Sequence, residues 1–150
     1  MDQAEIETEV VAIVGTDASI IYQDQHFYVE IESSEIPWLK IFTHHPYKEL
    51  GDMPKELRSL LWEFYDAIEY EMKTYYNPTK INMASFANML PRVHIHVMAR
   101  FENDSYFPNP MWGEKLREGD LILPDNTLFY ENVKNALEKI ASKHTLEGLI

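Results

Sequence analysis

The chain has 150 residues, with 25 acidic and 13 basic side chains and a net charge of −12 when histidine is neutral. This charge argues against a broad nucleic-acid interface, which needs clustered lysine and arginine. The lack of cysteine excludes disulfides, thiolate metal sites and cysteine nucleophiles. Because 45% of the residues are apolar and no repeat or linker interrupts them, residues 1–150 are expected to form one domain.

No segment is expected to enter or cross a membrane. The N-terminus from Met1 to Glu5 is acidic, whereas a signal peptide begins with a basic region. The longest plain apolar stretch, Val10–Val14, is about a quarter of a membrane span. We therefore expect a soluble, cytoplasmic protein.

The first third of the chain is typical of β-strands. Val10–Val14 is a β-branched run and is predicted to be a strand. Ile20–Tyr22 and His26–Ile31 flank a polar tripeptide, Gln23–Gln25, which predicts a hairpin turn. A further strand is expected over Trp38–Phe42.

The clearest helix is predicted to begin near Asp52. Aspartate is a favourable N-cap, and Pro54 is tolerated in a first turn. Apolar residues then recur at helical spacing, at Leu57, Leu60, Leu61, Phe64, Ile68 and Met72. The helix should end before Asn77-Pro78, because the residue before a proline disfavours the α region.

The second half repeats the order of strands followed by a helix. Strands are predicted over Lys80–Ala84 and Val93–Phe101. A last helix should start at Asp125 or Asn126 and end near Ser142. Its inward stripe is expected to contain Phe129, Val133, Leu137 and Ile140. This order is typical of an α+β fold with helices against an antiparallel sheet.

The segment from Arg92 to Arg100 carries the most chemical information. Side chains alternate between the two faces of a strand. One face would hold the apolar residues Val93, Ile95, Val97 and Ala99, and the other would hold Arg92, His94, His96, Met98 and Arg100. Four groups that can carry positive charge repel one another on one face unless an anion meets them, so this row points to a site.

Three interpretations of the two histidines compete at this point. The first is an exposed sheet face with ordinary, hydrogen-bonded histidines. The second is a metal site, because imidazoles at i and i+2 can converge on one ion, with Glu102 or His45 as a third ligand. A cupin-type barrel is disfavoured, since the chain has only five glycines.

The third interpretation is phosphoryl or nucleotidyl chemistry. A neutral imidazole is nucleophilic near neutral pH and can attack phosphorus. A second imidazole can hydrogen-bond a phosphate oxygen or assist the leaving group. Nearby positive charge stabilises the charge-rich transition state. This interpretation uses every member of the polar face except Met98.

The segment Arg92-Val93-His94-Ile95-His96-Val97-Met98 resembles the histidine triad (HIT) superfamily of nucleotide hydrolases and transferases, whose pattern is H-φ-H-φ-H-φ-φ with φ apolar. Flanking segments resemble a bacterial subgroup of that family. These segments are Ile36–Leu39, Pro46–Asp52, Lys80–Ala84, Asn88–Pro91, Arg100–Asp104 and Phe107–Gly113. The resemblance covers roughly residues 20–113 and implies a HIT-like α+β domain with a curved antiparallel sheet, two principal helices and a homodimer.

The resemblance also implies a division of roles. His94 would be the nucleophile that forms a nucleotidyl-histidine, and His96 would contact the phosphate or the leaving group. Asn82 and Asn88 are expected to bind phosphate. Glu32, or Glu30 in its place, is expected to hold the ribose hydroxyls.

Arg92 departs from the family pattern, which has histidine at that position. An arginine there could bind phosphate bidentately through a permanent charge. It could equally block the pocket or pair with a local carboxylate. Arg92 is therefore a candidate phosphate ligand with these alternatives open.

The expected activity is hydrolysis or transfer at the α-phosphate of a nucleotide, with dinucleoside polyphosphates and nucleoside phosphoramidates as the leading substrates. The alternatives are a nucleotide-binding module without turnover and a histidine-ligated metal site. No cofactor is required by the histidine mechanism, and Mg²⁺ is expected only as a companion of a polyphosphate. His44, His45 and His144 are expected at the surface. Trp112 could cover the site, as the resemblance implies, but a tryptophan beside two prolines is more often simply packed.

Overall fold

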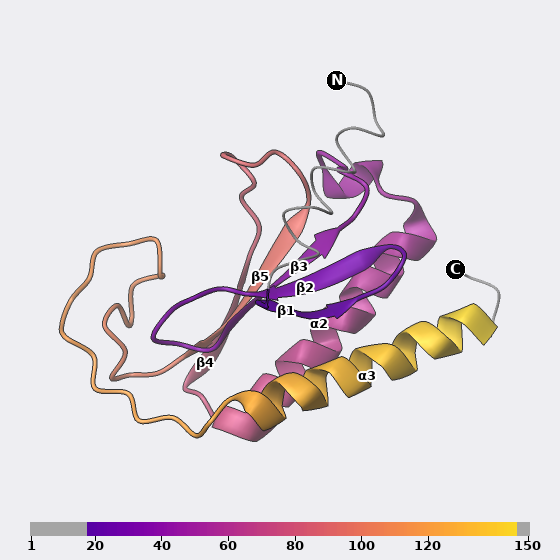
Figure 1. Ribbon diagram of the computed structural model, residues 1–150. Helices are drawn as coiled ribbons and strands as arrows, with labels where there is room; N and C mark the ends of the chain where they lie inside the picture. Colours follow the sequence, from indigo (N-terminus) through magenta and orange to yellow (C-terminus); the bar gives the residue numbers. More distant parts are fainter. Residues whose placement is uncertain (1–17, 147–150) are drawn as a thin grey trace.

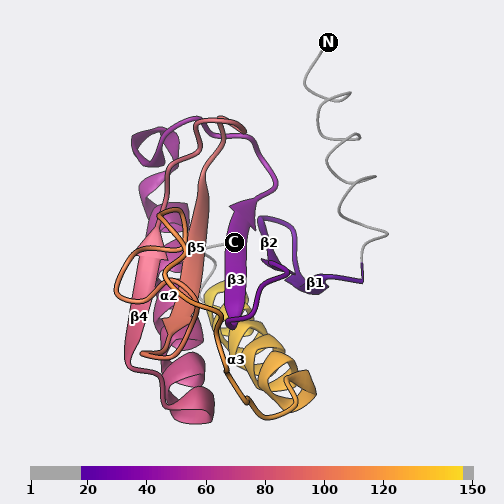
Figure 2. The ribbon, with the colours of Figure 1, turned by 90° about the vertical axis from the view of Figure 1, so that its left-hand side faces the viewer.

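The computed structural model describes residues 18–146, in which five strands form one antiparallel sheet in the order β1-β2-β3-β5-β4. The strands are β1 Ile20–Gln23, β2 Phe27–Ile31, β3 Trp38–Thr43, β4 Lys80–Ala84 and β5 His94–Arg100; the helices are the 3-10 helix η1 Leu50–Asp52, α2 Lys55–Tyr76 and α3 Thr127–Leu146. Figures 1 and 2 show both long helices beside the curved sheet. The α+β prediction with two principal helices is confirmed, whereas the predicted strand Val10–Val14 lies outside the described residues.

The predicted hairpin between β1 and β2 is present, and its turn is built around Asp24. One carboxylate oxygen of Asp24 accepts hydrogen bonds from the backbone N–H groups of His26 and Phe27, at 2.7 and 2.8 Å. Short aspartate side chains form such local bonds readily, which explains why this residue reverses the chain here.

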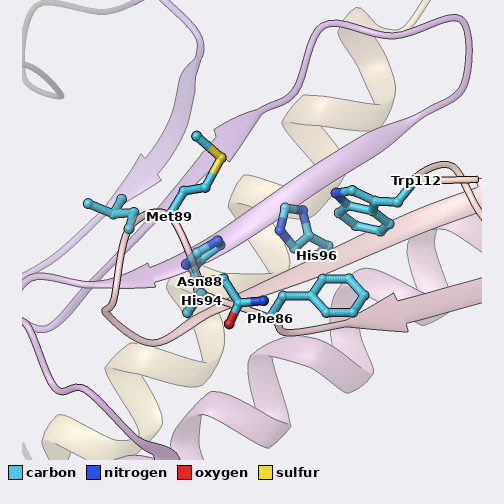
Figure 3. A pocket seen from close by; sticks show the side chains of 8 residues that line it. Phe86, Asn88, Met89, His94, His96 and Trp112 are labelled. Carbon is cyan, nitrogen blue, oxygen red and sulfur yellow. The ribbon is translucent and has the colours of Figure 1, made fainter.

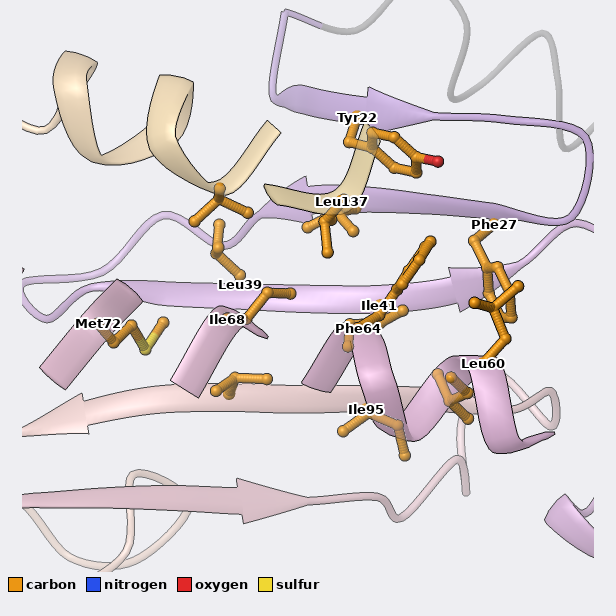
Figure 4. Packing of buried hydrophobic residues seen from close by; sticks show 14 of the residues in the cluster. Tyr22, Phe27, Leu39, Ile41, Leu60, Phe64, Ile68, Met72, Ile95 and Leu137 are labelled. Carbon is orange, nitrogen blue, oxygen red and sulfur yellow. The ribbon is translucent and has the colours of Figure 1, made fainter. Parts of the chain in front are cut away.

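The hydrophobic core lies between the helices and one face of the sheet. Figure 4 shows Phe64 and Ile68 of α2 and Leu137 of α3 packed against strand residues such as Ile41 and Ile95. The predicted inward face of β5 is confirmed, since Val93, Ile95, Val97 and Ala99 all belong to the core cluster that includes the residues of both helices. The apolar stripes of both helices therefore fix which face of the sheet is left for chemistry.

The start of α2 differs from the prediction. The helix begins at Lys55, with Pro54 as its N-cap. Asp52 instead ends the 3-10 turn, and its carboxylate accepts a hydrogen bond from the N–H of Glu49 at 3.0 Å. Asp52 therefore satisfies the turn before the helix and does not cap the helix. The predicted end before Pro78 is confirmed, because Asn77 adopts a left-handed conformation with φ of 48°.

Helix α3 begins close to the predicted start and extends beyond Ser142 to Leu146. Asp125 accepts a hydrogen bond from the N–H of Thr127 at 2.9 Å, which satisfies one free amide of the first turn. His144 is not solvated as expected: it is buried and its ring contacts the carboxylate of Glu63 on α2. Packing against α2 thus supports the last turn. In the described part of the chain, no helix has both the length and the apolarity to cross a bilayer.

Candidate active site

The face of the sheet opposite the helices carries the two histidines. In the pairing of β3 with β5, Phe42 lies opposite His94, Lys40 opposite His96 and Trp38 opposite Met98. Residues that lie opposite one another in an antiparallel pair share a face. The predicted alternation of β5 therefore holds, and β3 supplies a row of aromatic and charged neighbours for both imidazoles.

A cavity of about 450 Å³ opens over His94 and His96. The loop 86–90 and Trp112 form the rest of its wall, and Figure 3 shows Phe86 and Trp112 on the side of His96, with Asn88 beside His94. Each histidine is only 9% exposed. Aromatic and aliphatic side chains dominate the wall, so this cavity excludes much of the water around the two imidazoles.

The hydrogen bonds of His94 define where its proton lies. Its Nδ1 is 2.9 Å from the backbone carbonyl oxygen of Arg92, and a carbonyl can only accept, so Nδ1 carries the hydrogen. The Nε2 atom is then left with its lone pair. The ring stacks on Phe42 with 4.8 Å between centroids and 12° between planes, which holds the imidazole in one orientation.

His96 is held in the opposite tautomer. The indole Nε1–H of Trp38 donates to its Nδ1 at 3.0 Å, and because an indole nitrogen can only donate, the hydrogen of neutral His96 lies on Nε2. The edges of Trp38 and Trp112 contact the ring, with centroids 5.7 and 4.9 Å away. One imidazole therefore offers a lone pair at Nε2 and its neighbour offers an N–H.

Both imidazoles are kept neutral near pH 7. Burial lowers the pKa of His94. Burial, followed by the charges of His94 and Lys40, lowers the pKa of His96 to about 4. Because only a neutral imidazole has a free lone pair, this environment favours the nucleophilic form of His94.

Arg92 does not line the cavity. Its guanidinium Nη2 donates to the backbone carbonyls of Thr43 and His44, the latter at 3.1 Å, and the side chain is 4% exposed. A direct phosphate contact by Arg92 is not supported by this placement, because its donors are turned toward the end of β3. The two alternatives are also not observed, since Arg92 neither fills the cavity nor pairs with a carboxylate of the described chain.

Arg100 lies on β5 as expected, but its positive charge is not free to meet a ligand. Its guanidinium is 1% exposed and binds both carboxylate oxygens of Asp104, at 2.9 and 3.1 Å. Burial alone would raise the pKa of Asp104, but hydrogen bonds from Arg100 and backbone N–H groups hold it below its usual value. The charge of Arg100 is thus neutralised by Asp104, which lies four residues later in the sequence.

The two asparagines that were expected to bind phosphate lie in different places. Asn88 lines the cavity, as its expected role requires. Asn82 lies on β4 outside the cavity wall, and its Oδ1 accepts a hydrogen bond from Arg100 at 2.9 Å. Asn82 therefore supports the buried arginine, and its expected phosphate contact has no support from this geometry.

The expected ribose ligand lies in a neighbouring cavity of about 340 Å³, which Glu32 lines together with Trp38. Glu32 pairs with Lys40 at 3.1 Å, and Glu30 pairs with the same ammonium at 3.3 Å. Lys40 lies opposite His96 across the β3–β5 pair. Glu32 is therefore connected to the histidines through Lys40 and Trp38, not by sharing their cavity.

Three site residues escaped the prediction from sequence. Trp38 sets the tautomer of His96, Lys40 lowers the pKa of both imidazoles, and Phe86 forms a wall of the cavity. Trp112 is not simply packed, because it is 48% exposed and lines the cavity. Alternation along Trp38–Phe42 could have placed Trp38 and Lys40 on one face, but only the pairing with β5 shows which histidine each one meets.

The metal interpretation needs a third ligand beside the two histidines. Within residues 18–146, no three histidine, aspartate or glutamate side chains form a group that could hold an ion. The two suggested ligands, Glu102 and His45, therefore do not join His94 and His96.

Comparison with known proteins places this fold and site in a family. Residues 15–103 match the HIT domain family, which is more than half of the chain. No curated protein sequence matches significantly. A histidine triad protein from Bradyrhizobium japonicum has 22% identity and a TM-score of 0.64, covering 85% of this chain and 93% of its own. One from Marinobacter aquaeolei has 22% identity and a TM-score of 0.61, covering 90% and 94%.

A third similar structure, a histidine triad protein from Sinorhizobium meliloti, has 19% identity and a TM-score of 0.62, covering 85% of this chain and 93% of its own. These structures share the fold described above, and the family match includes both histidines of β5. The chain therefore belongs to the HIT domain family.

Proposed function

We propose that this protein is a nucleotide hydrolase or nucleotidyltransferase in which His94 attacks the α-phosphorus of a nucleotide. The observation that carries the proposal is the pair of opposite tautomers at the cavity floor. The backbone carbonyl of Arg92 accepts the Nδ1–H of His94, and the indole N–H of Trp38 donates to Nδ1 of His96. The result is one nucleophilic nitrogen beside one hydrogen-bond donor, which is what an in-line displacement at phosphorus requires.

The reaction would proceed in two displacements. In the first, the Nε2 lone pair of His94 forms a bond to the α-phosphorus while the bond to the leaving atom breaks and that atom takes a proton from solvent. The Nε2–H of His96 hydrogen-bonds a phosphate oxygen or the leaving atom. In the second, water or another acceptor attacks phosphorus, loses a proton, and releases His94 together with the nucleotide product.

The residues that line the cavity indicate which leaving group would fit it. Two aromatic rings, Phe86 and Trp112, stand 4.9 Å apart between centroids beside His96, and the described residues of the wall include no lysine, arginine or carboxylate. A flat, uncharged leaving group fits such a wall better than a polyphosphate chain, because buried phosphate charge needs a partner. Nucleoside phosphoramidates are therefore the first substrates to test, followed by dinucleoside polyphosphates with Mg²⁺.

Trapping the covalent intermediate tests this proposal. We would mix the protein with adenosine 5′-phosphoramidate or diadenosine triphosphate, quench within seconds, and measure the masses of the intact protein and of its proteolytic peptides. We expect an adenylyl adduct on a peptide containing His94 and release of AMP, both lost in His94→Asn. His26→Asn is the control, because His26 lies in the β1–β2 turn outside the cavity. An adduct on another residue, or no AMP from any donor, would overturn the proposal.

Nucleotide binding and metal content separate the alternatives. Saturable nucleotide binding without AMP release would identify a binding module that lacks turnover. Stoichiometric zinc in the purified protein, lost in His94→Asn, would identify a metal site. The homodimer and the nucleotide as the partner of the site stay predictions.

A further inference from the structure

Two buried arginines flank the two histidines, and their charges have different partners. Arg100 binds Asp104 through two hydrogen bonds, at 2.9 and 3.1 Å. Among residues 18–146, Arg92 donates only to the carbonyls of Thr43 and His44, and its buried Nε has no hydrogen-bond partner there. Within the described chain, one full positive charge therefore remains uncompensated beside the nucleophile.

Burial of an unpaired guanidinium opposes folding, because the desolvated charge gains no carboxylate in return. Burial accordingly lowers the pKa of Arg92, and among the described residues the opposing influence comes from Tyr28 and not from a carboxylate. An apolar side chain could fill the same space at lower cost. A residue that is unfavourable for stability and adjacent to a reactive group is a candidate for a functional role.

The backbone and the side chain of Arg92 act on the same neighbourhood. Its carbonyl oxygen accepts the Nδ1–H of His94. Its guanidinium holds the carbonyls of Thr43 and His44, which follow Phe42, the residue on which His94 stacks. The side chain of Arg92 therefore ties the end of β3, which carries Phe42, to the main chain at position 92, which carries the carbonyl that accepts from His94. The stacking partner and the hydrogen-bond acceptor of His94 are thus held together by one guanidinium.

We propose that Arg92 is a positioning residue for His94: its guanidinium fixes the backbone that orients the imidazole, and its uncompensated charge adds to the effect of burial in keeping the imidazole neutral. The consequence for catalysis rests on the proposed function of His94 as the nucleophile. The effect on the protonation of His94 does not, and can be measured in the absence of any substrate.

The charges around His94 come from several elements. Burial is the largest influence and lowers its pKa, and the positive charges of Lys40 on β3 and of Arg92 lower it further. The carbonyl of Arg92 and the carboxylate of Glu30 on β2 raise it, while His96 is its neighbour on β5. Substitutions of Arg92 leave Lys40, Glu30 and His96 in place, which isolates the contribution of the guanidinium.

Three variants of Arg92 separate the effect of its charge from the effect of its hydrogen bonds to the end of β3. Arg92→Lys keeps the charge, Arg92→Gln keeps a donor for a carbonyl without the charge, and Arg92→Met keeps neither. Arg58→Gln is the matched control, because the Nη1 of Arg58 also donates to a backbone carbonyl, that of Leu50 at 3.3 Å, and Arg58 is not among the charges acting on His94. The pKa of His94 is measured by NMR, and kcat/KM is measured with adenosine 5′-phosphoramidate between pH 4 and 9 (about the range in which an imidazole titrates).

We expect Arg92→Gln and Arg92→Met to raise the pKa of His94 and to move the acidic limb of kcat/KM to higher pH. Arg92→Lys and Arg58→Gln should leave both near the wild-type position. On the alkaline plateau, where His94 is neutral in every variant, Arg92→Met should lose about 100-fold in kcat through misplacement of the imidazole, and Arg92→Gln should lose less.

Two results would overturn the inference. An unchanged His94 pKa in Arg92→Gln and Arg92→Met would reject the role of the charge, and a wild-type plateau in Arg92→Met would reject the role of the hydrogen bonds. If Arg92→Met does not fold, the comparison of Arg92→Gln with Arg92→Lys tests both points. A wild-type protein that makes no adduct contradicts the proposed function instead, and the NMR titration still decides the effect of the charge.

Discussion

Substitution of Trp38 by phenylalanine tests how the tautomer of His96 is set. Phenylalanine keeps an aromatic ring at this position but removes the indole N–H that donates to Nδ1 of His96. Without that donor, Nδ1 loses its partner and neutral His96 can place its hydrogen on either nitrogen. We therefore expect less of the tautomer that presents an N–H to the substrate, and a rise in the pKa of His96 from about 4.

The magnitude follows from the one hydrogen bond that is lost. A neutral hydrogen bond in a partly buried site contributes roughly 1–2 kcal/mol, because the buried acceptor is left unsatisfied. If all of that energy supports the productive tautomer, kcat falls by about 5- to 30-fold, since 1.36 kcal/mol corresponds to a factor of about ten. The loss should be larger for substrates whose leaving group depends more on the hydrogen bond from His96.

The assay combines kinetics with NMR. We would measure kcat for a series of adenosine phosphoramidates with leaving amines of different basicity, and titrate His96 by NMR. Trp112→Phe is the comparison, because Trp112 also contacts His96 edge-on, whereas among the described residues the hydrogen bond to Nδ1 of His96 comes from Trp38, so this substitution should leave the pKa of His96 near the wild-type value. If Trp38→Phe changes neither that pKa nor kcat for any amine, the tautomer argument is refuted.

Further predictions concern stability and the cavity wall. Asp104→Asn leaves the buried charge of Arg100 without its carboxylate and should lower the free energy of unfolding by about 3–5 kcal/mol in urea titrations; a loss below about 1 kcal/mol would contradict this. The folded-state pKa of His96, about 4, lies below its unfolded value, so the unfolded chain binds the proton first and stability should fall by roughly 2 kcal/mol as pH drops from about 6.5 to about 4. His96→Gln should remove that part of the pH dependence, and an identical slope in the variant would count against it. Phe86→Ala should raise KM for a phosphoramidate with an aromatic amine more than for one with ammonia as the leaving group, whereas equal changes would show that Phe86 does not contact the leaving group.

Local patterns predicted most of the secondary structure. The alternation along β5, the helical stripe from Leu57 to Met72 and the end of α2 before Pro78 depend on residues that are close in sequence. The prediction placed the start of α2 too early because Asp52 can either cap the helix or accept a hydrogen bond within the preceding turn. In the structure, its carboxylate accepts from the N–H of Glu49 in the 3-10 turn.

Sequence alone determined that His94, His96 and Arg100 share one strand face and that this face is chemically distinct from the core, whereas Arg92 precedes the strand, which begins at His94. The tertiary structure decided what each group can do. Trp38 lies 58 residues from His96, so only the pairing of β3 with β5 brings the indole N–H to the imidazole. Likewise, within the part of the chain that the structure describes, folding brings a carboxylate to Arg100 and only carbonyls to Arg92. Burial and hydrogen bonding set tautomers and protonation states, and both depend on neighbours that are remote in sequence.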